Sequence, residues 1–316
     1  MRLLVITQAV DLRDSNLGFF HRWIEEFASH SEQVIVVCLR KGEHALPDNV
    51  EVISLGERGK LMRTLSLCAI SFGRRKEYDA VFAHMSPEFV VAAGWLWRLL
   101  GKKTALWYVH KSVTVWLRIA TFFVHHIFTA SDESFRLETK KKTIIGHGID
   151  TDFFTPDPAV RREKHILSVG RLSESKQHDL VIKAAVFAKR KLRIAGEGPE
   201  RQNLESLAAF LHADVTFLGG LSQEELRDEY RKAAFLIHAS VTGSVDKVVL
   251  EALACDCAVI TTASVFREFP VHVVEESPEA IAEALTHPSL SFDRVNLIRE
   301  KYSLPVMIQK LLSLYA

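Results

Sequence analysis

The chain has 316 residues, of which 48% are hydrophobic and 25% charged, and its formal net charge is +1. These values are typical of a folded globular protein with two domains of ordinary size, and they argue against a disordered chain. The longest candidate for a membrane span, Val113–Ala130, is interrupted by Arg118, His125 and His126 and falls short of the roughly 20 apolar residues required.

The N-terminal segment lacks the apolar core of a signal peptide, and the four cysteines show neither zinc spacing nor a disulfide framework. We therefore expect a reduced, cytoplasmic protein.

The first half of the chain alternates short apolar runs with amphipathic segments. Apolar residues at helical spacing predict a helix from Phe20 to Phe27, and similar patterns predict helices at Lys60–Phe72 and Phe89–Leu100. The expected strands are Leu3–Thr7, Gln33–Leu39, Val50–Leu55, Ala80–Ala83, Thr104–Val109, Ile127–Ala130 and Thr143–Ile145. Nearly continuous apolar strands between helices predict a parallel sheet that is covered on both faces.

A segment rich in Gly, Asp and Pro, Gly146–Asp157, breaks this alternation and is the expected hinge between domains. A second alternating set follows it. Its expected strands are Ile166–Val169, Leu192–Ala195, Val215–Leu218, Phe235–His238, Ala258–Thr261 and His272–Val274. Its expected helices are Asp179–Ala188, Glu200–Leu211, Gln223–Lys232, Val245–Ala254 and Pro278–Leu285, with an amphipathic helix, Leu304–Tyr315, at the end of the chain.

The sequence therefore predicts an α/β protein with two doubly wound, Rossmann-like domains that face each other across a cleft. The expected first domain covers residues 1–146 and the second residues 147–303, and a C-terminal helix, 304–316, can cross back to the first domain. Ligands of such sheets bind at the carboxyl ends of the strands.

One stretch, Ala239–Thr262, carries the strongest local signal for a ligand. Small residues, Ser240–Ser244, lead into the expected helix Val245–Ala254, whose free N–H groups and dipole favour phosphate. If this loop holds a diphosphate, Glu251, two helical turns further on, can reach the attached ribose.

Further strand ends carry glycines and cations. Gly170, Arg171 and Lys176 follow one expected strand, and two cations beside a glycine suit a diphosphate. Gly196 and Gly219 follow the next two strands. Each glycine alone is consistent with an ordinary turn, but the set, taken with Arg171, Lys176 and Glu251, favours a binding site.

The motifs SVGRLSESKQHDLVIKA, LRIAGEGP, VTFLGGLSQEEL and VVLEALACDCAVITT, in this order, resemble family 4 glycosyltransferases, also described as glycosyl transferases group 1. The segment HGIDTDFFTP is similar to their interdomain linker. This resemblance implies a retaining enzyme with the GT-B fold. It also implies a nucleotide-sugar donor, with UDP or GDP, bound mainly by the second domain, and a reaction without a metal or resident cofactor.

The resemblance assigns roles to residues of the second domain. Arg171 and Lys176 match the pair that neutralises the donor diphosphate, and Glu251 matches the second glutamate of the Glu-x7-Glu motif, which binds ribose. The first glutamate of that motif corresponds to Gly243, which is a departure from the pattern. Asp246 is either a substitute for that carboxylate or an ordinary acid at a helix start. The remaining expected donor contacts are Ser244, Val245 and Lys247.

In the first domain, the resemblance points to residues after the expected strands. His110 matches the family histidine that contacts the donor sugar, and with Arg171 and Lys176 it is a candidate catalytic residue. Gly18 stands near the family's glycine loop and is an expected donor contact. The candidates for the acceptor side are Asn16, His84 and Lys111.

Two features of the sequence leave alternatives open. Asp150-Thr151-Asp152 has the form of a metal motif but matches the linker, so we expect no metal site there. Because Gly243 stands where the family has a glutamate, one alternative to a glycosyltransferase is a non-catalytic protein that binds nucleotide sugars. The other alternative is a nucleotide-sugar epimerase on the same fold.

Residues 58–118 are strongly basic, with eleven Lys and Arg residues against three Asp and Glu residues, a difference of +8. The expected helix within Lys60–Lys76, with Trp95, Trp97, Lys102 and Lys103 nearby, can lie on an anionic membrane, which would suit a lipid-linked acceptor. The alternative is a solvated helix face beside a groove for a glycan acceptor. No nucleic-acid-binding module is recognised, so we expect no nucleic-acid partner.

Overall fold

The computed structural model describes residues 1–14, 17–286 and 293–315. The chain divides into two compact units. The first comprises Met1–Gly148 together with Leu304–Ala316, and the second comprises Ile149–Ser303. Each unit is described separately below.

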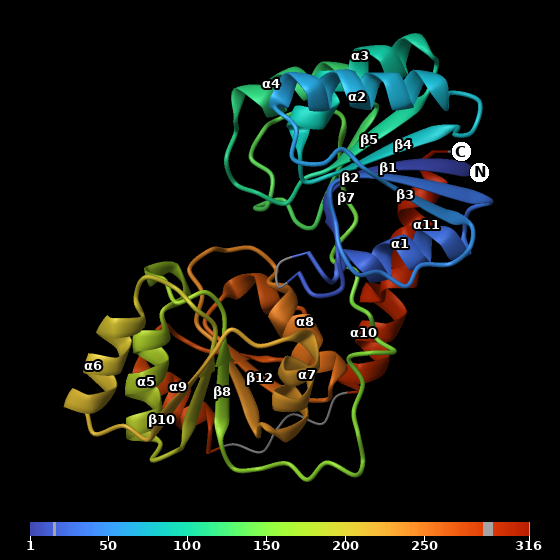
Figure 1. Ribbon diagram of the computed structural model, residues 1–316. Coiled ribbons are helices and arrows are strands. Elements are labelled where there is room, and N and C mark those ends of the chain that lie inside the picture. The colour runs from blue at the N-terminus through green and yellow to red at the C-terminus, as the bar shows by residue number, and fades with distance from the viewer. Residues whose placement is uncertain (15–16, 287–292, 316) are drawn as a thin grey trace. The chain divides into compact units, whose positions relative to one another are not determined.

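The first unit is built on a seven-stranded parallel sheet with the order β3-β2-β1-β4-β5-β6-β7 (Figure 1). The strands are β1 (Arg2–Val10), β2 (Gln33–Lys41), β3 (Val50–Ser54), β4 (Ala80–His84), β5 (Lys103–Trp107), β6 (His126–Thr129) and β7 (Lys142–Ile144). The central strand, β1, pairs with β2 and β4 and buries apolar side chains on both of its faces.

Helices cover both faces of this sheet. On one face, α1 (Phe20–Ser29) and the C-terminal helix α11 (Leu304–Ser313) pack together over Leu3 and Val5. On the other face, α2 (Lys60–Gly73), α3 (Pro87–Leu99) and α4 (Val115–Phe123) pack over Leu4 and Ile6. Alternate residues of β1 therefore serve two separate cores, which explains why the strand reads as one continuous apolar run.

The C-terminal helix is fixed to the first sheet by Tyr315, which follows its last turn. The hydroxyl of Tyr315 donates a hydrogen bond to the Val81 carbonyl at 2.8 Å, and Lys103 Nζ donates to the Tyr315 carbonyl at 2.7 Å. The chain thus returns to its first unit after completing the second.

The second unit has a six-stranded parallel sheet with the order β10-β9-β8-β11-β12-β13. Its strands are β8 (Ile166–Val169), β9 (Leu192–Ala195), β10 (Val215–Gly219), β11 (Phe235–His238), β12 (Ala258–Thr261) and β13 (His272–Val273). Its helices are η1 (Glu174–Lys176), α5 (His178–Phe187), α6 (Arg201–Phe210), α7 (Gln223–Lys232), α8 (Lys247–Ala254), η2 (Ser264–Phe266), α9 (Pro278–Ala284) and α10 (Arg294–Tyr302). The strand order reverses between β8 and β11. From β8 the chain continues to β9 and β10 at one edge of the sheet, and from β11 it continues to β12 and β13 at the other edge.

The prediction of two parallel α/β sheets is confirmed, and several boundaries are corrected. The expected helix at Val245 begins two residues later, at Lys247. The sequence reading also missed α4 and α10. The segment of α4 lies within the apolar run Val113–Ala130, where high overall hydrophobicity hides the spacing of a surface helix. No helix formed by the described residues has the length and hydrophobicity of a transmembrane span.

Candidate functional site

The loops after β8 and β11 adjoin each other at the point where the strand order of the second sheet reverses. The two strands pair directly, and the Val241 amide in one loop donates a hydrogen bond to the Ser175 carbonyl in the other at 3.2 Å. In open α/β sheets, ligands bind at such a reversal, outside the carboxyl ends of the strands. The stretch Ala239–Thr262 therefore begins where the topology favours a ligand.

The loop after β8 presents the predicted cation Arg171. Its side chain is exposed, and among the described residues it has no ion pair or hydrogen-bond partner. The chain then turns through η1, and Gln177 adopts a left-handed conformation with φ of 44° before α5 begins. Arg171 is thus free to bind an anion without breaking an existing contact.

The loop after β11 is lined by hydroxyl groups. Ser240 Oγ lies 2.9 Å from Thr242 Oγ1, which lies 3.2 Å from Ser244 Oγ. Gly243 adopts φ of +70°, which favours glycine. The loop ends at Asp246, where α8 begins, so Gly243, Ser244 and Val245 precede the helix and do not form its first turn.

Asp246 joins the two loops through a partly buried cluster. Its carboxylate accepts a hydrogen bond from Lys176 Nζ at 2.5 Å and another from His238 Nε2 at 2.8 Å. Because an ionised carboxylate only accepts, His238 carries its proton on Nε2, and its Nδ1 faces Thr261 Oγ1 at 2.9 Å. Asp246 makes no side-chain cap on α8. It therefore acts as a partner of Lys176, which is a third role beyond the two that the sequence suggested.

Burial raises the pKa of Asp246, but the hydrogen bond from His238 and the charge of Lys176 outweigh burial and hold this pKa below its ordinary value. We expect Asp246→Ala to lower the free energy of unfolding at pH 7 by roughly 1–3 kcal/mol, the scale of hydrogen bonds to charged groups. Because the folded pKa is the lower one, this stability is fully present above the unfolded pKa of about 3.9 and is lost progressively as the pH falls from there toward the folded pKa.

Urea unfolding at pH 7 and at about pH 3 tests this expectation. The matched control is Asp179→Ala, which removes a more exposed carboxylate paired with Lys183 and should change stability little. A difference between wild type and Asp246→Ala that persists unchanged at the lower pH would show that the carboxylate charge is not the source of the stability.

Glu251 lies on α8 with its side chain buried. Its carboxylate accepts a hydrogen bond from the Tyr230 hydroxyl at 3.2 Å, and Lys247 Nζ lies 3.4 Å from its other oxygen. Burial raises the pKa of Glu251, and the Lys247 charge partly offsets this effect. Glu251, the residue predicted to bind ribose, thus also takes part in a buried polar contact between α7 and α8.

The glycines at the strand ends have a structural reason for being glycine. A Cβ on Gly196, whose φ is +141°, would lie 1.9 Å from the Gly170 carbonyl oxygen. Gly170 donates its amide hydrogen to Ala195, and Gly196 donates to Gly219 at 2.7 Å. Backbone packing between adjacent loops therefore explains Gly196 without a ligand, and the glycines alone are weaker evidence for a site than the sequence suggested.

We expect Gly196→Ala to lower the free energy of unfolding by about 2 kcal/mol or more, because the methyl group overlaps a carbonyl and the backbone is strained. Gly220→Ala is the matched control, since its Cβ would meet its nearest atom at 3.8 Å and its φ is not positive. Chemical denaturation of both variants checks this. Equal stability of Gly196→Ala and wild type would contradict the packing explanation.

The first unit carries the other predicted site residues. His110 is exposed and lies three residues beyond the end of β5, which is shorter than expected. Its Nδ1 accepts a hydrogen bond from the Ser112 amide at 3.0 Å, and Lys111 follows it in the chain. Gly18 donates its amide hydrogen to Asp14 at 2.8 Å, within the loop before α1. Asn16 lies outside the described residues.

His84 does not line an open surface, contrary to the role suggested for it. It is the last residue of β4 and is 1% exposed, and its ring stacks on Phe20 with centroids 4.0 Å apart. Burial lowers the pKa of His84 to about 3, so the ring is neutral at physiological pH. We therefore correct His84 from an acceptor-side residue to a core residue.

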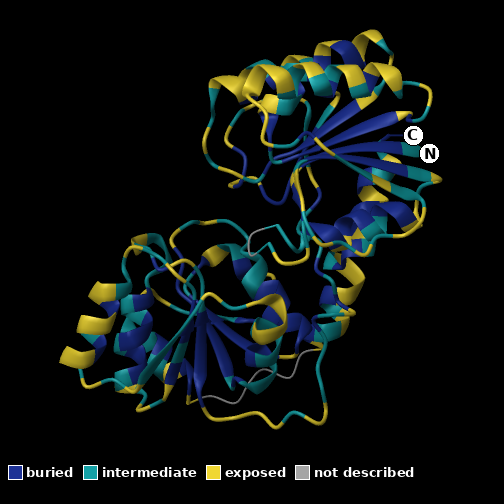
Figure 2. Cartoon of the chain, viewed as in Figure 1, coloured by how far each residue is buried: buried dark blue, intermediate teal, exposed yellow. Residues whose placement is uncertain are grey.

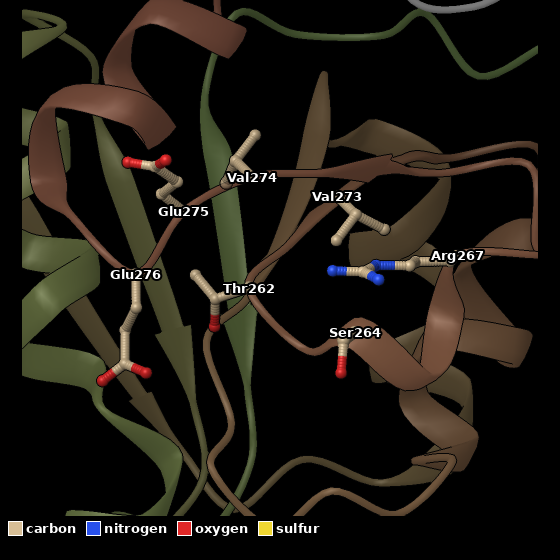
Figure 3. Close-up of a pocket in the computed structure, with 7 residues that line it drawn as sticks. All are labelled: Thr262, Ser264, Arg267, Val273, Val274, Glu275 and Glu276. Atoms are coloured by element: carbon tan, nitrogen blue, oxygen red, sulfur yellow. The ribbon is translucent and has the colours of Figure 1, made fainter.

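A pocket of about 460 Å³ lies at the carboxyl ends of β12 and β13 (Figure 3). Ser264 and Arg267 lie on one side of Thr262, and Glu275 and Glu276 lie on the other. None of the predicted site residues lines this pocket. The pocket nevertheless adjoins the loop after β8, because Gln177 Nε2 donates a hydrogen bond to the Glu276 carboxylate.

Sequence reasoning missed two residues that hold the predicted ones in place. His238 is the last residue of a correctly predicted strand, so a polar residue at a strand end next to a small-residue loop was an available signal. Tyr230, fully buried on α7, gave no signal, because its partner Glu251 is twenty-one positions away in the sequence.

Comparison with known proteins agrees with this architecture. Residues 151–287 match the family described as Glycosyl transferases group 1. The similarity covers the part of the chain in which the sequence motifs predicted it. The match begins just after the first residues of the second unit and includes β8 through α9.

Two curated relatives resemble parts of the chain. An N-acetylgalactosaminyltransferase of Campylobacter jejuni that acts on a diphospho-undecaprenol acceptor is 33% identical over 136 residues, 41% of this chain and 37% of the relative. The D-inositol 3-phosphate glycosyltransferase of Mycobacteroides abscessus is 32% identical over 179 residues, 48% of this chain and 40% of the relative. The chain thus matches less than half of the length of each.

Solved structures resemble the whole chain. HepE of Anabaena, solved in complex with UDP, has a TM-score of 0.77 at 14% identity, with 99% of each chain covered. At this identity the likeness concerns the fold, which is the two-sheet α/β arrangement of GT-B glycosyltransferases.

Proposed function

We propose that the chain is a retaining glycosyltransferase that transfers a sugar from a nucleoside-diphosphate donor to a hydroxyl group of its acceptor. The observation that carries this proposal is the pair of joined loops after β8 and β11, which present an unpaired guanidinium, Arg171, in a domain of the glycosyl transferases group 1 family. When the sugar is transferred, the nucleoside diphosphate is the leaving group. A cation such as Arg171 stabilises the negative charge that develops on it.

The two cations have different parts in this proposal. Arg171 is exposed and presents a planar fork that matches phosphate oxygens. Lys176 is mostly buried and its charge is already shared with Asp246. Arg171 therefore supplies most of the charge stabilisation, and Lys176 adds a positioned hydrogen bond. In this proposal the two cations stabilise the leaving diphosphate without a metal ion.

Uridine diphosphate is the first donor nucleotide to test, because HepE was also solved with UDP-glucose. The acceptor is a glycan or a lipid-linked saccharide, and the name of the Campylobacter relative, with its diphospho-undecaprenol acceptor, favours the lipid-linked class. His110 is a proposed catalytic residue and Lys111 a proposed acceptor contact, both on the resemblance to the family.

A non-catalytic nucleotide-sugar-binding protein is the second candidate function, and Gly243 is the observation that favours it. The family motif has a carboxylate where Gly243 stands, and Asp246, the candidate substitute, is engaged with Lys176 and His238. Incubation with UDP- and GDP-sugars in the presence of lipid-linked acceptors separates the two. Release of nucleoside diphosphate with a product that keeps the anomeric configuration supports the transferase, and binding without release supports the alternative.

A further inference from the structure

The helices α2, α3 and α4 of the first unit expose a concentration of large apolar side chains. Of the sixteen such side chains exposed among the described residues, nine lie on these three helices. Figure 2 shows that the outer surface of these helices is exposed while the sheet beneath them is buried. Monomeric proteins scatter exposed apolar side chains singly, so this concentration indicates an interaction surface.

The exposed side chains follow helical spacing on the side of each helix that faces away from the sheet. On α2, Leu61, Leu65 and Phe72 are separated by four and seven positions and share one side. On α3, Trp95 and Leu99 are exposed four positions apart. The opposite sides of α2 and α3 are buried in the core of the first unit.

Helix α4, which the sequence reading missed, extends the same surface. It packs beside α3, and Arg98 Nη1 on α3 donates a hydrogen bond to the Phe122 carbonyl on α4 at 2.7 Å. Val115, Trp116 and Phe122 are exposed on α4, with Arg118 between them and also exposed. We refer to the exposed side chains of α2, α3 and α4 together as the helical face.

The charge of the helical face is positive. Lys60, Arg98 and Arg118 are exposed among the apolar side chains, and Arg58 precedes α2. The three helices contain a single acidic residue, Glu88. Trp97 and Lys102, which the sequence reading included, are not part of the face, because Trp97 is fully buried and Lys102 contacts the Tyr78 carbonyl and ring.

We infer that the helical face binds the surface of an anionic lipid bilayer. Cations interleaved with Leu, Phe and Trp are what such a surface requires, since the indole and apolar groups enter the headgroup region while the cations meet anionic lipids. A protein partner would also bury the apolar groups, but the exposed charges of the three helices are cationic except for Glu88, and an anionic bilayer complements such a surface across its whole extent. The inference deepens the proposed function, because a bilayer is where a lipid-linked acceptor would be presented. It rests on the proposed function for that class of acceptor.

Co-sedimentation of the full chain with vesicles tests the inference. Vesicles of phosphatidylcholine with phosphatidylglycerol are compared with phosphatidylcholine alone, at low salt and at about 0.5 M salt. We expect binding to the anionic vesicles that weakens at the higher salt and is much weaker for neutral vesicles.

Two combined variants assign the binding to the helical face. The apolar variant, Leu61→Ser with Leu99→Ser and Phe122→Ser, should bind at least about tenfold more weakly. The charge variant, Arg58→Gln with Lys60→Gln and Arg118→Gln, should bind roughly a hundredfold more weakly at low salt, from roughly fivefold for each of the three cations near the surface.

Matched controls replace equally exposed residues of the second unit. They are Phe187→Ser with Phe210→Ser, and Arg161→Gln with Lys164→Gln and Lys191→Gln. The unfolding temperature and the affinity for UDP are measured for every variant. Both should stay close to the wild-type values if the variant is folded. Controls that bind vesicles like wild type, with weakened helical-face variants, support the inference.

Absence of binding to anionic vesicles overturns the inference, and so does undiminished binding by both helical-face variants. Concentration-dependent self-association that the apolar variant abolishes, without vesicle binding, would instead make the face an interface between copies and would also overturn it. Failure of UDP binding with intact vesicle binding would count against the proposed function and leave the membrane surface standing.

Discussion

Replacement of Arg171 by alanine is expected to lower kcat/KM for the nucleotide-sugar donor by at least about a hundredfold, the scale of losing one charge-stabilising group in a transition state. The guanidinium is exposed just beyond the carboxyl end of β8. Among the described residues it has no partner that would lose a contact in the variant. The variant should therefore fold with the stability of wild type, and the loss should appear in catalysis alone. Initial rates of nucleoside diphosphate release measure the effect.

Two further variants sharpen this prediction. Arg171→Lys keeps the charge but loses the planar fork, so its activity should fall between those of wild type and Arg171→Ala. Lys191→Ala is the matched control, since this exposed cation precedes β9 at the opposite edge of the same sheet and should leave activity unchanged. Activity of Arg171→Ala within about twofold of wild type would rule out a role for this side chain on the donor phosphates.

The second large effect is expected at Glu251. Glu251→Ala should lower kcat/KM at least about a hundredfold if its carboxylate binds the ribose of the donor. It should also lower the free energy of unfolding by roughly 1–3 kcal/mol, because the buried Tyr230 hydroxyl loses its acceptor. Activity per folded molecule and urea unfolding separate these two consequences.

Two conservative variants decide between the catalytic and structural roles of Glu251. Glu251→Gln keeps the shape and an acceptor for Tyr230, and it should lose most activity with a smaller loss of stability. Tyr230→Phe removes the hydroxyl and leaves the carboxylate in place, and it should keep most activity. Wild-type nucleotide affinity and turnover in Glu251→Gln would make Glu251 a structural residue of the contact between α7 and α8.

Short-range patterns were sufficient to predict the fold. The strands Ile166–Val169, Leu192–Ala195 and Phe235–His238 were predicted to the residue, because buried parallel strands are nearly continuous apolar runs bounded by polar or glycine-containing turns. Helix α7 was predicted as well, and Ser222 begins it with a capping box closed by Glu225. Helix α4 was missed because it lies within the apolar run Val113–Ala130, whose high hydrophobicity hides the helical spacing.

The partners of the site residues could not be predicted, because they depend on which strands are neighbours. Lys176 and Asp246 are seventy positions apart and meet because β8 and β11 pair in the sheet. The burial of His84 depends in the same way on the packing of α1 over β4. Sequence patterns located the loops, but the charge state and the availability of each side chain within them required the folded chain.

Calorimetric titration with UDP, GDP and ADP tests the central claim, that the joined loops after β8 and β11 bind a nucleoside diphosphate. We expect one of the three to bind wild type at a single site, and the combined Arg171→Ala and Lys176→Ala variant to bind it at least about a hundredfold more weakly, from the loss of two charge-assisted phosphate contacts. The Lys191→Ala control should bind like wild type. Affinity that is unchanged in the combined variant, or no binding of any of the three by wild type, would contradict the claim.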